Sequence, residues 1–301
     1  LYEYQSLGGK RTTEKTIVSN VVQAQQIKSL GFNPISAINN LLFGLISNFN
    51  ESMGGRFYNF KQFRNAFGIM LDTTKHYVKY SNSDRRQKIS NYLIKNDILF
   101  ELLDHKYGRE ELADLDKAYA WLKSGDFFMK GVSTVAALMN RKIQTANGEM
   151  PMWDVLQSDG EINRDLFTKD QLEDWDENGK YELAEYIKEI NKKIHGNADP
   201  SAAVLAKNNS LGMLLSQFKL TWLLEGAYSR WGGERYSEVL GMSLKGRYNS
   251  LFSLATDADT GDIGFKVLVK NLFNFVVKGE QGTLSDLDYE NMKRNKAELL
   301  Y

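Results

Sequence analysis

The stretch from Asp174 to Glu185 is where residue types and spacing come closest to a chemical site. Its sequence, DWDENGKYELAE, fits the EF-hand calcium loop D-x-[DN]-x-[DN]-G-x5-E. Calcium takes oxygen ligands, and Gly179 stands where this loop makes its sharp turn. The spacing predicts that four side chains and one backbone carbonyl surround the ion. These predicted calcium ligands are Asp174, Asp176, Asn178, Lys180 (through its carbonyl) and Glu185.

The same acidic segment also fits a structural role. Its eighth position is Tyr181, where calcium loops usually carry a small aliphatic residue, and no second loop of this pattern occurs in the sequence. The alternative is an acidic helix–turn–helix whose carboxylates cap the helix that begins near Lys180. A second acidic turn, Asp257 to Asp262, has its glycine one place early for calcium, so we expect its aspartates to cap the following helix.

The rest of the sequence offers little catalytic chemistry. Cysteine is absent, which excludes disulfides, thiolate catalysis and cysteine–zinc sites. The three histidines, His76, His105 and His195, are far apart and form no HExxH spacing. Phosphate-loop, nucleophile-elbow and kinase patterns do not occur either. We therefore predict a non-enzymatic protein with no catalytic residue and no cofactor other than the calcium alternative.

Basic and aromatic residues alternate in four short segments. Surfaces of this kind stack bases and hold phosphates. Lysine and arginine side chains that lie along helix ends produce the same pattern, so both interpretations stay open. The net charge of zero provides no overall attraction to nucleic acid. The segments are Arg56–Tyr58, Lys75–Tyr80, Asp84–Arg86 and Lys245–Tyr248.

The helix that organises the chain is predicted over Asn33–Met53. Asn33 is a favourable N-cap, Pro34 suits the first helical position, and Gly54-Gly55 ends the pattern. Five asparagines in and beside the apolar run argue against a stable membrane span, because an unpaired amide costs free energy in lipid. We expect a buried or partner-facing helix. Its apolar face consists of Ile35, Ile38, Leu42, Leu45, Ile46, Phe49 and Met53.

Helical periodicity continues through most of the chain, and we predict a mainly α fold, a multi-helix bundle with a small β-hairpin-like excursion near residues 141–156. Arg109–Met139 is predicted as a helix broken at Gly125 and Gly131. The turn at Asn147-Gly148 predicts the hairpin. The other helices are predicted over Thr12–Ser29, Asn59–Tyr80, Ser83–Ile94, Ile98–Tyr107, Lys180–His195, Leu211–Trp231, Glu234–Leu254, Asp262–Val277 and Ser285–Leu300.

Three regions follow from this pattern: an N-terminal helical region over 1–140, an acidic loop and hairpin region over 141–180, and a C-terminal helical region over 181–301. Because the first residue is Leu1, we expect one continuous fragment of a larger protein. Asp154–Ile190 carries 12 acidic residues against 4 basic ones. This segment is either a solvated acidic face or a docking surface for a basic partner.

Several segments carry a family resemblance. The longest runs from Leu215 to Gly233 and continues over Gly241–Tyr248. The others are Asn33–Gly44 with Gly54–Arg56, Asn147–Asp154 and His195–Asp199. Together they resemble the very large internal virion proteins of crAss-like and related tailed phages, which are cargo or ejection proteins.

The resemblance implies a mostly helical, non-enzymatic structural or cargo protein packaged in the capsid or tail of a phage particle. Its partners would be the portal, the tail barrel and other cargo proteins, close to the packaged DNA. It would occupy the virion interior and enter the host cell with the genome. The alternatives are a fragment of a virion-delivered enzyme, such as an RNA polymerase, and a calcium-binding interaction module.

Overall fold

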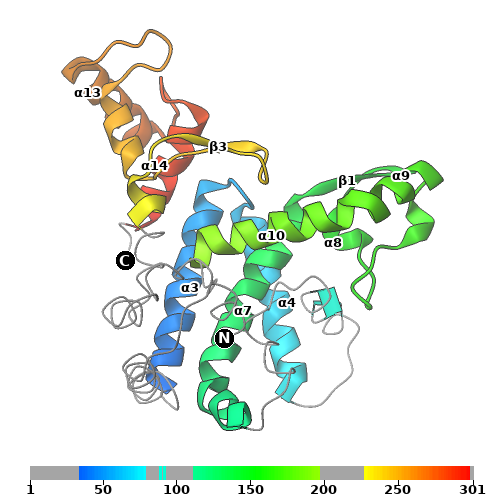
Figure 1. Ribbon diagram of the computed structural model, residues 1–301. Coiled ribbons are helices and arrows are strands. Elements are labelled where there is room, and N and C mark those ends of the chain that lie inside the picture. Colours follow the sequence, from blue (N-terminus) through cyan, green and yellow to red (C-terminus); the bar gives the residue numbers. More distant parts are fainter. Residues whose placement is uncertain (1–33, 79–87, 90, 93–110, 197–226, 299–301) are drawn as a thin grey trace, which may run out of the picture.

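The computed structural model describes residues 34–78, 88–89, 91–92, 111–196 and 227–298 of the 301-residue chain. This part is mainly helical and contains two small antiparallel two-stranded sheets (Figure 1). The predicted mainly α class with a hairpin near residues 141–156 is therefore confirmed. The helices predicted over Thr12–Ser29 and Ile98–Tyr107 lie outside the described residues, as do most of Ser83–Ile94 and Leu211–Trp231.

Three long helices form the centre of the structure. They are α3 (Pro34–Gly54), α4 (Phe60–Val78) and α7 (Glu111–Asn140), and both α3 and α4 pack along α7. The predicted start of α4 is confirmed, because Gln62 N donates to Asn59 Oδ1 (3.1 Å) and Asn59 N donates to Gln62 Oε1 (2.7 Å). The helix α10 (Lys180–His195) packs across α3 and α7 with the bounds that the sequence predicts.

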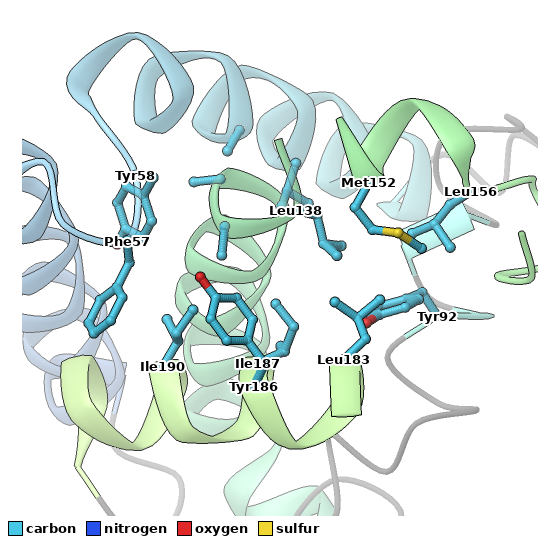
Figure 2. Close-up of a cluster of buried hydrophobic side chains, with 14 of the residues drawn as sticks. Phe57, Tyr58, Tyr92, Leu138, Met152, Leu156, Leu183, Tyr186, Ile187 and Ile190 are labelled. Carbon is cyan, nitrogen blue, oxygen red and sulfur yellow. The ribbon is translucent and has the colours of Figure 1, made fainter. Parts of the chain in front are cut away.

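The main hydrophobic core lies between α4, α7 and α10. Figure 2 shows Ile187 and Ile190 pointing from α10 into this core, which they share with Leu138 of α7 and with Tyr58. The Tyr58 hydroxyl donates to Asn48 Oδ1 (2.8 Å), so its only polar group is satisfied inside the core. Burial raises the pKa of Tyr58 well above its usual value.

The inward side of α3 agrees only in part with the predicted one, because Leu45 of the predicted face packs against the main core, as does Leu41. Ile38, Leu42 and Met53 belong to the predicted apolar face, yet they are exposed. The fully buried residues of α3 are polar or small. The helices α7 and α14 (Asp286–Glu298) pack closely against them and provide hydrogen-bond partners. The residues buried on it include Gly44, Asn48, Glu51, Ser52 and Gly54.

The helix α7 is continuous through Gly125 and Gly131, so the predicted breaks are wrong. Gly131 is buried against α4, and a Cβ there would lie 2.4 Å from Met70 Cε. Glycine at this position thus permits close packing between α4 and α7 rather than ending the helix. Burial on several sides supplies the stabilisation that glycine lacks by itself.

The predicted hairpin is formed by β1 (Lys142–Thr145) and β2 (Gly148–Pro151), with the turn at Asn147-Gly148. The short helix α8 (Met152–Val155) follows at once and buries both of its terminal residues in the main core. Trp153 is half-buried against the same core, and the Lys88 ammonium lies 4.2 Å from the centre of its ring. The hairpin is therefore held to the bundle through α8 and Trp153.

Residues 234–254 form a second hairpin and a turn of 3-10 helix, so the helix predicted over Glu234–Leu254 is wrong. The strands are β3 (Arg235–Ser237) and β4 (Met242–Leu244), and the 3-10 segment is η6 (Asn249–Ala255). Gly246 N donates to Gly232 O (2.8 Å), and a Cβ on Gly246 would lie 2.5 Å from Gly232 N. This close approach of two backbone segments requires glycine and prevents a continuous helix.

In the C-terminal part the helices lie where the sequence predicts them, but the N-terminus of α13 is capped differently. The helix α13 (Phe265–Phe273) continues into a π-helical turn, η7 (Asn274–Lys278), and α14 follows. The predicted capping of α13 by aspartates is wrong, because Gly264 is its N-cap and no side chain caps it. Asp257 Oδ1 instead accepts from Asp259 N (3.0 Å) and Thr260 N (3.2 Å) inside its own turn.

Gly160, in the loop after α8, generates a first prediction. Its φ is 84°, and a Cβ there would lie 2.6 Å from the backbone nitrogen of Tyr92. Gly160→Ala should lower the free energy of unfolding by about 3 kcal/mol, since a left-handed backbone costs about 1 and forced backbone displacement about 2.

The matched control is Gly241→Ala. Gly241 also has a positive φ, 64°, but nothing lies within 4 Å of the added Cβ. This substitution should cost only about 1 kcal/mol. Urea denaturation of both variants provides the comparison, and equal losses would contradict the close approach at Gly160.

Candidate protein interface

The predicted calcium segment is helical in the structure. The helix α9 (Lys169–Asp174) leads through a π-helical turn, η3 (Trp175–Gly179), directly into α10. Gly179 has φ −58° and ψ −36°, which are right-handed helical values. The sharp turn of a calcium loop is therefore not formed, and the prediction of a loop is corrected to continuous helix.

Packing explains why this segment continues as a helix. Thr168 and Gln171 form a capping box that starts α9. The Trp175 ring is buried in the main core, and a Cβ on Gly179 would lie 2.8 Å from that ring. Gly179 thus leaves space for the indole instead of making a turn.

The predicted calcium ligands do not converge. Arg164 donates to both carboxylate oxygens of Asp176 (3.0 and 2.7 Å), which lowers the pKa of that carboxyl group. Lys180 Nζ donates to Glu161, and Glu185 accepts from Lys188. Asp174 and Asn178 are exposed. Within the described residues, no group of three or more His, Asp or Glu side chains gathers in a way that could hold a metal ion.

Among the three histidines, His195 is the one whose side chain lies beside polar groups in the described structure. Its Nε2 lies 3.2 Å from Ser133 Oγ, and Ser133 donates to Asn191 Oδ1 (2.6 Å). A serine beside a histidine is one element of nucleophilic catalysis, but Ser133 is 0% exposed in the middle of α7. The contact therefore joins α7 to α10. His76 lies in α4, and His105 falls outside the described residues.

A buried polar cluster connects α3 to α14, and we call it the α3–α14 joint. Its centre is the ion pair between Glu51 and Arg294 (2.5 Å), whose side chains are only 10% and 8% exposed. Glu51 also accepts from Phe57 N (3.3 Å), and Arg294 donates to Asn291 Oδ1 (2.8 Å). Gly54 permits the approach, because a Cβ there would lie 2.6 Å from Arg294 Nε.

Two of the basic–aromatic segments are used inside the structure. Lys245 pairs with Asp288 (2.7 Å), and Arg247 and the Tyr248 hydroxyl both donate to Glu298 (2.8 Å each). Arg56 pairs with Glu290 (3.4 Å) and donates to the Ser243 carbonyl. These cations hold the second hairpin and α14 together rather than facing a nucleic acid. The side chains of Lys75–Tyr80 and Asp84–Arg86 lie outside the description.

A group of exposed apolar side chains lies on and beside α13. Only Asn271 and Phe275 of this helix and its π-helical turn are buried, whereas Ile263 and Phe265 are 78% and 77% exposed. Figure 1 shows α13 at the outer edge of the C-terminal part, away from α3, α4 and α7. We define the α13 face as Ile263, Phe265, Val269, Leu272, Phe273, Val276 and Val277, all of which are exposed.

The α13 face is larger than an ordinary exposed patch. An aromatic side chain presents about 150–250 Å² and an aliphatic one somewhat less, so the exposed fractions amount to roughly 600–900 Å². The largest patch on a typical monomer is about 300–600 Å². A helix that is apolar on both its inner and outer sides is normally buried on both. We therefore identify the α13 face as the candidate protein interface.

Sequence reasoning did not single out this face, although a signal was present. The stretch Phe265–Lys278 reads FKVLVKNLFNFVVK, with apolar residues around most of the helix and no acidic residue. Among the helices of the described part, none combines the length and the apolar character that crossing a bilayer requires. No protein-family model, curated protein or solved structure matches the chain.

Removal of Arg294 should destabilise the protein strongly. Arg294→Met leaves the Glu51 carboxylate buried without its partner, which typically costs about 3–5 kcal/mol. The control is Arg164→Met, because Arg164 and Asp176 form an ion pair that is exposed rather than buried. Thermal denaturation should show a large decrease in Tm for the first variant and little change for the second. Similar decreases in both would contradict the importance of burial in the α3–α14 joint.

His195 should make stability fall in mild acid. Burial, with a smaller effect of the Lys130 charge, lowers its pKa from 6.5 to about 3. Between these values the unfolded chain binds the proton and the folded chain does not, so stability decreases as the pH falls below 6.5. The loss between pH 7 and pH 5 should be about 1–2 kcal/mol.

His195→Gln should remove that part of the pH dependence while keeping a polar side chain beside Ser133. Urea denaturation at both pH values, for the variant and the unchanged chain, measures the difference. An identical loss in the two proteins would show that other groups cause the acid sensitivity.

Proposed function

We propose that the chain is a non-enzymatic structural or cargo protein of a tailed-phage virion. It is packaged in the capsid or tail and enters the host cell with the genome. Its partners are other virion proteins, namely the portal, the tail barrel and further cargo proteins, close to packaged DNA. The proposal combines the sequence resemblance with a surface suited to protein contact.

The exposed α13 face is the observation that carries the proposal. Its residues are aliphatic and aromatic, and Lys266, Lys270 and Lys278 accompany them. Aromatic side chains at a contact supply large buried area at little entropic cost. Such a surface binds another macromolecule, whereas catalysis needs convergent polar groups in a site that substrate can reach.

The segments that carry the resemblance also have structural roles in the described part. Asn147–Asp154 forms β2 and most of α8, and Gly54–Arg56 meets the strand β4 through the Arg56 contact with Ser243. The first of these segments packs on α7, and the second contacts β4 and α14. Their use in packing fits a family whose shared residues serve architecture.

The composition supports delivery through a narrow tail. A protein that passes a portal has to unfold and refold. The absence of cysteine prevents cross-links, and the three prolines leave few slow isomerisation steps. Helices make mostly local contacts and form again quickly.

Mass spectrometry of purified particles tests this function. Particles treated with nuclease and washed at high salt should contain the chain in a constant ratio to the portal protein. A non-virion protein of the same phage, measured in the same preparations, is the control for carry-over from lysate. Absence of the chain, or its removal with the control protein, would refute the proposal.

A further inference from the structure

We propose that the α13 face binds a second copy of this chain, so that two α13 helices pair side by side and in parallel. This inference goes beyond the proposed function and does not depend on packaging in a virion. It rests on the spacing, charge and size of the face.

The spacing suits helix pairing. Phe265, Val269, Leu272 and Val276 follow one another at intervals of four, three and four residues. This is the a/d spacing with which two helices interdigitate in a coiled coil. We call these four residues the seam; three lie in α13 and Val276 lies in the following turn η7, and all four side chains are exposed.

The charges and contacts on either side of the seam select the orientation. Along one flank, α13 packs on its own chain through Leu268, Asn271 and Phe275. Lys266 and Lys270 lie on the other flank, because successive helical residues advance by about 100°. The two flanks of the seam are therefore different.

A twofold axis parallel to the two helices is compatible with flanks that differ in this way. It places the two chains on opposite sides of the pair and sets each lysine flank beside the other chain. An antiparallel pair would bring both chains to the same side and would set the lysines of both copies against one another, which is repulsive. The geometry thus favours a parallel, isologous pair.

The size of the face is sufficient for a specific contact. Complete coverage of both faces would bury at most about 1,200–1,800 Å² in total, to which Ile263, Phe273 and Val277 contribute beside the four residues at a/d spacing. Stable protein interfaces commonly bury about 1,200–2,000 Å². The two faces also consist of the same apolar residues, so each can bury the other without an unpaired charge at its centre.

Sedimentation of the 301-residue chain tests the pairing. The unchanged chain should have the mass of a dimer at about 0.1 mM. Val276→Glu should make it monomeric while leaving its circular dichroism unchanged, since Val276 is 53% exposed. The matched control is Val239→Glu, because Val239 is 50% exposed in the turn between β3 and β4. That variant should remain a dimer.

The absence of cysteine permits a test of orientation. Phe265→Cys should form a cross-linked dimer by itself on mild oxidation, because a parallel pair places each position beside itself. Cross-linking only in a mixture of Phe265→Cys and Val276→Cys would overturn the parallel pairing.

Two further results would overturn the inference. A monomeric unchanged chain at all accessible concentrations would exclude pairing. Binding of that monomer to phosphatidylglycerol vesicles, lost in Val276→Glu and retained in Val239→Glu, would assign the α13 face to a lipid surface instead.

Discussion

The buried ion pair between Glu51 and Arg294 is the interaction on which the arrangement of the described helices depends. Its two residues are 243 positions apart in the chain, so it joins α3 to α14 near opposite ends of the sequence. A buried pair gains little net stability, because desolvation of the two charges offsets most of their attraction. Its effect is to disfavour packings that bury either charge without the other, because such a charge would have no partner.

Several features of the structure follow from this joint. Arg56 and Lys245 extend it to the second hairpin, through the Ser243 carbonyl and the Asp288 carboxylate. The hairpin leads into η6, which packs on α13. The polar contacts beneath α14 thus connect to α13 through the hairpin and η6. Polar groups are buried beneath α14, whereas the apolar residues of the α13 face are exposed.

The predicted calcium loop shows that the spacing of residues within a short segment does not by itself determine the conformation of that segment. The segment Asp174–Glu185 has the residue types of a calcium loop, but the same residues also form a continuous helix. Burial of the Trp175 ring decides between the two, and that burial depends on core residues from distant parts of the chain. In the same way, the histidine–serine contact of His195 and Ser133 arises only because α10 crosses α7.

The sequence by itself determined the features with local causes. The reciprocal cap at Asn59, the turn at Asn147-Gly148 and the end of α10 before Gly196 all follow from neighbouring residues, and so does the mainly helical class. A helix over Asp262–Val277 was also predicted, but its exposed face was not, although Phe265–Lys278 is apolar around most of a helix.

Only the tertiary structure decided which face of α3 is buried, that α7 passes unbroken through Gly131, and that residues 235–244 form strands. Each of these depends on contacts between segments far apart in sequence, such as Met70 against Gly131. Caps and periodicity act over a few residues. Burial acts between whole elements, and the free energy of packing exceeds the propensities that a single stretch of sequence expresses.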